Sequence, residues 1–170
     1  MLEIVEGRKP VIAKVHGSAF AAGCQLAASC DLALSTNDAK FATPGVNIGL
    51  FCSTPMVAVS RKVSKKRMMK MLLTGDSITA KYAKEIGLIN DHHDKSQLNY
   101  EVLSLARKIA SKSNLTIKIG KKAFYKQSEM SLRKAYKFTS KVMTENMMAM
   151  DAKEGISAFI EKRKPKWKNK

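Results

Sequence analysis

The chain has 170 residues, 45% of them hydrophobic and 26% charged. That is enough apolar material for one domain with a core, and it argues against disorder. Three cysteines, an odd number, argue against a disulfide scaffold, and no apolar run approaches the roughly 18 residues of a membrane span. The charge balance is unusual, because 31 Lys and Arg against 14 Asp and Glu give a net charge of +17.

The excess positive charge lies in the C-terminal two thirds of the chain. Residues 1–50 carry four basic and four acidic groups, residues 51–95 carry nine and four, and residues 96–170 carry eighteen and six. Such a basic surface can attract RNA, anionic lipid or a phosphate-rich small molecule, or it can consist of solvated helix faces. Aromatic residues make up only 6% of the chain, so the stacking platforms of single-strand binders are poorly supplied.

The first 95 residues alternate short apolar runs with small-residue turns, which indicates an α/β layer. The opening residues predict the tail of a helix that runs into Gly7. Strands are predicted over residues 11–16, 32–34 and 88–90. Helices are predicted over residues 24–30, 53–59, 65–73 and 80–86, the last two capped by Ser64 and Thr79. Residues 92–95 are interpreted as a polar boundary.

Beyond residue 96 the pattern is helical. Two apolar stripes at helical spacing predict helices over residues 98–109 and 132–150. Asp151 and Glu154 have the spacing of a capping box and predict a third helix that runs to about residue 162. The chain is therefore expected to divide into an α/β core, residues 1–95, and a helical extension of the same domain, residues 96–170.

The turn from Gly17 to Gly23 is the best local candidate for a site. Its small residues let the backbone bend tightly and approach a ligand closely. The helix that follows directs unpaired N–H groups and the positive end of its dipole outward, which suits an anion or a developing oxyanion. The same small residues can also serve only to pack a strand closely against a helix.

Other catalytic patterns are absent. The turn is neither a nucleophile elbow nor a P-loop, and Ser18 has no paired base. The histidines lack zinc-ligand spacing, and adjacent His92 and His93 point apart. Cys24 and Cys30 lack C-x-x-C spacing and are interpreted as buried, inert thiols.

Four ordered segments resemble the enoyl-CoA hydratase/isomerase (crotonase) family. They are KPVIAKVHGSAFAAGCQLAASCDLALS, FATPGVNIGLFCSTP, LLTGDSITAKYAKEIGLIN and EGISAFIEKRKPKW, and together they span nearly the whole chain. The resemblance implies an α/β fold, a crotonase-like ββα spiral, followed by a helical region that builds trimers or dimers of trimers. It also implies a lyase-type role in fatty-acid and lipid metabolism, with coenzyme A entering as part of the acyl-CoA thioester substrate and no covalently bound cofactor.

The resemblance implies roles for specific positions. In the family, two backbone N–H groups stabilise a thioester enolate, and one of them matches Ala22, with Gly23 beside it. Two glutamates supply the general acid and base, but their positions match Gln25 and Gly45. An amide and a glycine cannot move protons as carboxylates do, so hydratase activity is expected to be weak or absent. The related spiral-fold serine peptidases need a serine in this turn, where Ala21 and Ala22 stand.

The remaining implications concern the two ends of the chain. The family's N-terminal turns carry the second oxyanion donor, and this sequence, which has no transit peptide, looks like the C-terminal part of the domain. Phe159, Lys162 and Arg163 match a helix that lies near CoA, whose phosphates suit Lys and Arg. The family implies the mitochondrial matrix and no membrane insertion. One basic member of the family binds RNA, so the alternative is a non-catalytic RNA-binding member.

Overall fold

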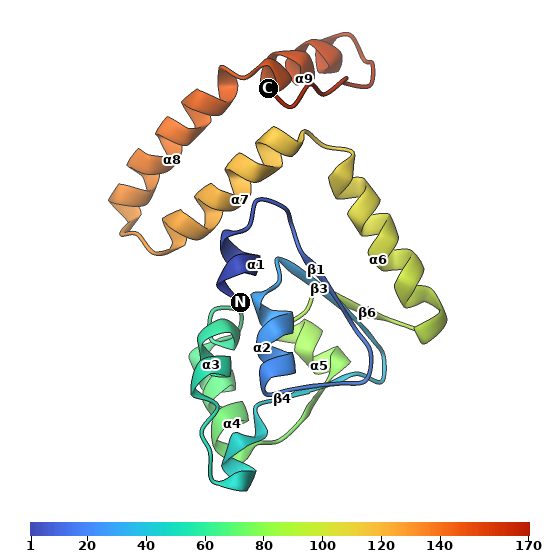
Figure 1. The fold of residues 1–170 in the computed structure, drawn as a ribbon, viewed down its shortest axis with the longest axis vertical. Coiled ribbons are helices and arrows are strands. Elements are labelled where there is room, and N and C mark those ends of the chain that lie inside the picture. The colour runs from blue at the N-terminus through green and yellow to red at the C-terminus, as the bar shows by residue number, and fades with distance from the viewer. The chain divides into compact units, whose positions relative to one another are not determined.

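The computed structural model describes all residues from 1 to 170 (Figure 1). The elements in chain order are α1 Leu2–Glu6, β1 Ile12–Val15, β2 Ser18–Phe20, α2 Ala22–Ser29, β3 Leu32–Thr36, β4 Lys40–Ala42, the 3₁₀ helix η1 Pro44–Ile48, α3 Ser53–Val59, α4 Lys65–Thr74, β5 Ile78–Thr79, α5 Ala80–Glu85, β6 Asp91–His93, α6 Lys95–Ala110, α7 Asn114–Ser128, α8 Leu132–Met147 and α9 Met150–Ile160. No helix is both long enough and apolar enough to cross a membrane.

The chain forms two compact units. Unit 1 comprises residues 1–5 and 11–105, and unit 2 comprises residues 6–10 and 106–170. The division therefore falls inside α6, about three helical turns beyond the 95/96 boundary expected from the sequence.

Unit 1 is a spiral in which successive turns contribute strands to two small sheets. One sheet is parallel, in the order β1-β3-β6, with Ile12 opposite Leu32 and Leu34 opposite Asp91. The other has the order β2-β4-β5, with β2 and β4 parallel and β5 antiparallel to β4. Parallel strands need covered faces, and α2 packs against α3 beside the sheets. Phe41 and Val59 in this layer are fully buried.

Polar side chains extend the parallel sheet beyond its strands. The backbone N–H of Val11 donates to the Asp31 carboxylate at 2.7 Å. The N–H of Ala33 donates to the side-chain oxygen of Asn90 at 2.8 Å, and the N–H of Asn90 donates back to the carbonyl of Ala33. These bonds satisfy backbone groups where the strand ladder ends.

Two predictions in this region are wrong. Residues 88–90 form no strand, because the N–H groups of Leu88 and Ile89 bond back to the carbonyl of Ala83 at the end of α5. The last strand begins at Asp91 instead, so His92 and His93 belong to β6 and not to a polar boundary. The polar strand is tolerated because Asn37 bonds to the ring of His92 and to Asp94.

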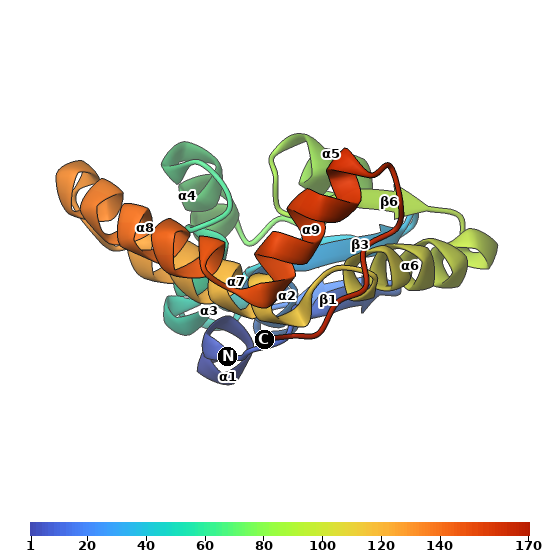
Figure 2. The ribbon, with the colours of Figure 1, turned by 90° about the horizontal axis from the view of Figure 1, so that it is seen from above.

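Unit 2 contains α7, α8 and α9, and α7 and α8 run antiparallel side by side in both views (Figures 1 and 2). The sequence predicted no separate helix over residues 114–128. No residue of α7 is buried, and four lysines interrupt its apolar pattern, so its periodic signal is weak.

The predicted capping box of α9 is also wrong. The helix begins at Met150 with Ala149 as its N-cap. Asp151 lies in the first turn, only 1% exposed, and accepts hydrogen bonds from the Ser113 hydroxyl and from the backbone N–H groups of Lys168 and Asn169. The carboxylate therefore holds the C-terminal segment and does not cap its own helix.

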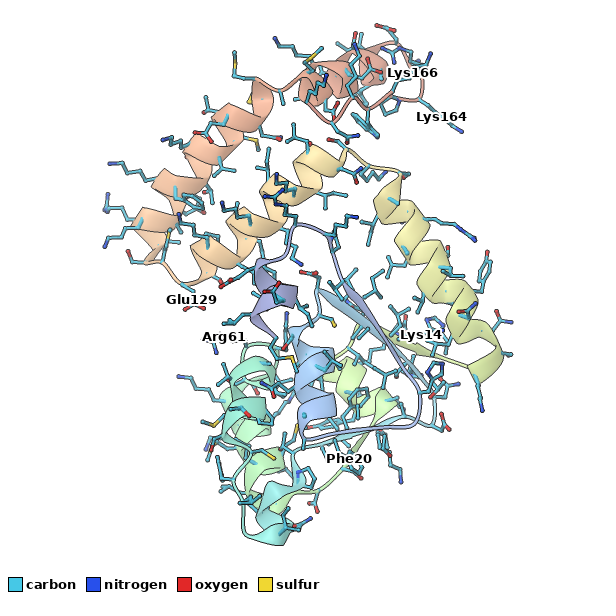
Figure 3. All side chains as sticks on the ribbon, viewed as in Figure 1. Lys14, Phe20, Arg61, Glu129, Lys164 and Lys166 are labelled. Atoms are coloured by element: carbon cyan, nitrogen blue, oxygen red, sulfur yellow. The ribbon has the colours of Figure 1, made fainter.

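The segment that follows α9, residues 161–170, is fixed at further points; it carries Lys164 and Lys166 (Figure 3). The Glu154 carboxylate accepts from the Arg163 guanidinium and from the Lys166 N–H. The ring N–H of Trp167 donates to the carbonyl of Ser111 at 2.8 Å. We call these ten residues the C-terminal strap.

Candidate functional site

The strand β2, which ends at Phe20 (Figure 3), turns abruptly into α2 at Ala21. Ala21 has φ 47° and ψ −112°, the conformation of the first central residue of a type II′ turn, where glycine is the usual residue. Its N–H donates to the carbonyl of Ala42 at 2.9 Å, and its carbonyl accepts from the N–H of Gln25 at 3.0 Å. A strained non-glycine residue held by its neighbours is typical of a functional turn.

The turn leaves the first N–H groups of α2 available. Ala22 and Gly23 are exposed. They lie in the first turn of the helix, where the backbone N–H groups have no acceptor carbonyl within the helix. A methyl group on Gly23 would lie 3.9 Å from Cβ of Ala19, an ordinary contact. Close packing therefore does not require glycine here, which weakens the purely structural interpretation of this turn.

Gln25 lies one turn further along α2 and is half-buried. Its carbonyl accepts from the Ser29 hydroxyl at 2.8 Å, while its side-chain amide makes no hydrogen bond within the chain. An amide at this position can orient a ligand, but it cannot exchange a proton near neutral pH.

Gly45 lies in η1, in a space closed to side chains. A methyl group in place of its α-hydrogen would lie 2.6 Å from the carbonyl oxygen of Leu50 and 3.0 Å from Sγ of Cys52. The N–H of Leu50 donates to the carbonyl of Gly45 at 2.9 Å, which fixes this approach. The sequence shows that residue 45 has no carboxylate. Only the fold shows that the Leu50 carbonyl and the Cys52 sulfur fill the space where a side chain would lie.

The three cysteines are buried and free. Burial, together with the nearby Cys52, raises the pKa of Cys24 to about 12, although a bond with the Ala42 backbone opposes the rise. The thiol therefore stays protonated at neutral pH, in line with the interpretation of Cys24 as inert. No group of three or more His, Cys, Asp or Glu side chains is placed to hold a metal ion.

The residues matched to a CoA contact lie in unit 2, whereas Ala22, Gly23, Gln25 and Gly45 lie in unit 1. Phe159 is 85% exposed near the end of α9, and Lys162 adopts a left-handed conformation at φ 54°. The Arg163 guanidinium binds two carboxylates, Glu154 and Glu161, each at 2.6 Å. Arg163 is thus already engaged within the chain, and these ion pairs raise its pKa further.

A spiral of strands in two small sheets, with a strained turn feeding a helix N-terminus, defines the crotonase-like class of α/β protein, and solved structures confirm it. An enoyl-CoA hydratase of Mycobacterium smegmatis superposes with a TM-score of 0.96 at 48% identity, over 98% of this chain and 65% of that one. Human enoyl coenzyme A hydratase domain-containing protein 3 superposes with a TM-score of 0.95 at 48% identity, over 98% and 66%.

The chain belongs to the enoyl-CoA hydratase/isomerase family, whose model matches residues 1–170. Human enoyl-CoA hydratase domain-containing protein 3, mitochondrial, is 48% identical over 98% of this chain and 55% of its own length. The 2,3-dehydroadipyl-CoA hydratase of Escherichia coli is 34% identical over 95% and 64%. The chain thus spans a little over half the length of the curated relatives it matches first.

Proposed function

We propose that the protein binds the thioester group of an acyl-CoA, with the N–H of Ala22 directed at the carbonyl oxygen, and that it hydrates enoyl-CoA weakly or not at all. Binding is supported by the exposed N–H groups at the strained turn and by relatives named as hydratases of CoA thioesters. CoA enters as part of the substrate, within fatty-acid metabolism.

The observation that carries the weak-hydratase proposal is the closed space at Gly45. Hydration needs one group to activate water and another to deliver a proton, and each such group typically contributes about 100- to 10,000-fold. Gln25 cannot titrate, and at Gly45 even a methyl group would meet the Leu50 carbonyl at 2.6 Å. The loss therefore involves the backbone around residue 45 as well as the side chain.

The test compares thioester binding with turnover. Butyryl-CoA is expected to bind more tightly than free CoA, whereas crotonyl-CoA hydration is expected to be at least about 100-fold slower than by an ordinary hydratase assayed in parallel. Turnover close to that of the ordinary enzyme would overturn the proposal. Equal affinity for butyryl-CoA and free CoA would show that the protein does not recognise the thioester group, which would overturn that part of the proposal.

Two variants locate the binding. Ala22→Pro deletes the proposed donor at the first helical position and should abolish the preference for butyryl-CoA. It is made in an Ala21→Gly background, with Ala21→Gly alone as the reference, because at ψ −112° the proline ring would collide with Cβ of Ala21. Gly23→Ala keeps every N–H and should preserve the preference, because its methyl group meets only an ordinary contact. Circular dichroism of each variant separates loss of the donor from loss of the fold.

We also propose that the chain assembles as a homotrimer in the mitochondrial matrix. The mitochondrial location is supported by the relatives whose names include it.

The trimeric assembly is supported by an apolar stripe on α8, whose members are each more than half exposed: Leu132, Tyr136, Met143 and Met147. Sedimentation equilibrium gives the mass in solution, and a monomer at micromolar concentration would contradict the trimer for this chain.

A further inference from the structure

A pocket of about 480 Å³ lies within unit 1, between α4, β5 and α5. It is open to solvent on one side, and its volume falls in the range of small-molecule sites. None of the candidate-site residues Ala22, Gly23, Gln25 or Gly45 lines it. The lining residues are Arg67, Lys70, Met71, Thr74, Asp76, Ser77, Ile78, Thr79, Tyr82 and Ile86.

Local hydrogen bonds hold the walls of this pocket in place. The Thr74 hydroxyl donates to the Lys70 carbonyl at 2.9 Å and accepts from the Asp76 N–H at 3.1 Å. Gly75, between Thr74 and Asp76, turns the chain at φ 69°. It packs closely on Asn47, because a methyl group on Gly75 would lie 2.8 Å from the side-chain oxygen of Asn47. On the other wall, the Thr79 hydroxyl accepts from the N–H of Tyr82 at 3.2 Å.

The pocket is apolar at its base and polar at its mouth. Met71 and Ile86 are 3% and 5% exposed and belong to the core, and Ile78 packs against the same cluster. The polar lining comprises two cations, one carboxylate and the hydroxyls of Thr74, Ser77, Thr79 and Tyr82. A ligand would therefore need a compact apolar part and a polar head.

The charges around the mouth are not satisfied within the chain. Arg67 and Lys70, one turn apart on α4, form no ion pair, and neither does Asp76. Three basic residues, Lys65, Lys66 and Arg67, occupy the first turn of α4, where the helix dipole favours anions. The Ser64 side chain does not cap the helix either. The pocket lies along the helix beyond this end and is lined by Arg67 and Lys70, so an anion between these two side chains would offset their charge.

We propose that this pocket binds a phosphomonoester that carries a small apolar group. The phosphate lies between the Arg67 guanidinium and the Lys70 ammonium, which together match its charge and its acceptor oxygens. The apolar group rests on Met71, Ile78 and Ile86. This site is separate from the thioester site and does not depend on the proposed function.

Phenyl phosphate, inorganic phosphate and phenol serve as probes, with binding measured by isothermal titration at fixed ionic strength because salt screens the exposed cations. Phenyl phosphate is expected to bind saturably and at least about fivefold more tightly than phosphate, since only it fills the apolar base. Phenol is expected not to bind measurably. Equal affinity for phenyl phosphate and phosphate would overturn the apolar part of the proposal.

Matched variants test the cations. Arg67→Ala with Lys70→Ala should weaken phenyl phosphate binding by at least about tenfold, since two charge-assisted contacts are lost. The control, Lys65→Ala with Lys66→Ala, removes the same amount of charge from the same helix, but neither residue lines the pocket. It should therefore change the affinity for phenyl phosphate by less than about threefold. Equal losses in both pairs would show a general electrostatic effect and overturn the site.

The carboxylate at the mouth provides a test in the opposite direction. Asp76→Asn removes a charge that repels an anion while its N–H can still bond to Thr74, so phenyl phosphate should bind about two- to fivefold more tightly. Unchanged or weaker binding would place the anion away from this pocket. Because this variant predicts a gain, it cannot be explained by a failure to fold.

Discussion

Replacing Gly45 with alanine adds one methyl group at the most confined glycine of unit 1. The new carbon would lie 2.6 Å from the Leu50 carbonyl oxygen, and a relaxed C···O contact of about 3.3 Å requires the backbone to open by about 0.7 Å. Overpacking of this kind costs about 1–3 kcal/mol. The same movement stretches the hydrogen bond from the Leu50 N–H to the Gly45 carbonyl, which adds about 0.5–1.5 kcal/mol.

We therefore expect Gly45→Ala to lower the free energy of unfolding by about 2–4 kcal/mol. Urea denaturation followed by circular dichroism measures the change, with Gly23→Ala as the control in the same unit, because its methyl group meets only Ala19 at 3.9 Å. A Gly45→Ala protein as stable as the control would refute the closed space. The same contacts oppose a glutamate at residue 45 in a Gln25→Glu, Gly45→Glu protein.

Two further outcomes are expected. Ala21→Gly should raise the free energy of unfolding by about 1 kcal/mol, because glycine adopts φ 47° without strain; a lower urea midpoint would contradict this. The hydrogen bonds from Arg163 and Lys166 lower the pKa of Glu154 from 4.5 to about 2, so its ionised form stabilises the docked strap above about pH 4.5, and this contribution is lost as the pH falls through about 2. The fluorescence emission of Trp167, the one tryptophan, should shift to the red over that pH interval, and the same shift should appear at pH 7 in Glu154→Gln. The control Glu145→Gln should show no shift, because the Glu145 carboxylate makes only an exposed 3.9 Å pair with Lys141. An unshifted Glu154→Gln spectrum would show that the Glu154 carboxylate does not hold the strap.

The elements that sequence could predict are those whose signals are local. The helix from Lys65 to Thr74 begins after Ser64 and ends at Gly75, as the sequence predicts, although the Ser64 side chain makes no capping hydrogen bond. Thr79 caps α5 with its side chain as predicted. Alternating small and apolar residues also sufficed for the α/β layer, because β1 and the first half of β3 lie within apolar runs.

The features that sequence could not predict depend on partners far along the chain. Asp151 has the spacing of a capping box, but its bonds go to Ser113 and Asn169. The start of β6 is set by bonds from Asn90 to Ala33, 57 residues away. At the candidate site, the absence of a side chain at Gly45 was visible in the sequence, whereas its obstruction by Leu50 and Cys52 required the fold.

Lys166 and Lys168 hold the C-terminal strap through their main-chain N–H groups, whereas Arg163 and Trp167 hold it through their side chains. Asp151 and Glu154 accept from the backbone N–H groups of residues 166, 168 and 169, so the side chains of Lys166 and Lys168 contribute nothing to these bonds. Evolution can therefore rewrite those positions at little cost in docking, provided that proline, which has no N–H, stays out of them. The positive charge at these two positions is set by requirements other than docking, whereas that of Arg163 is held by Glu154 and Glu161.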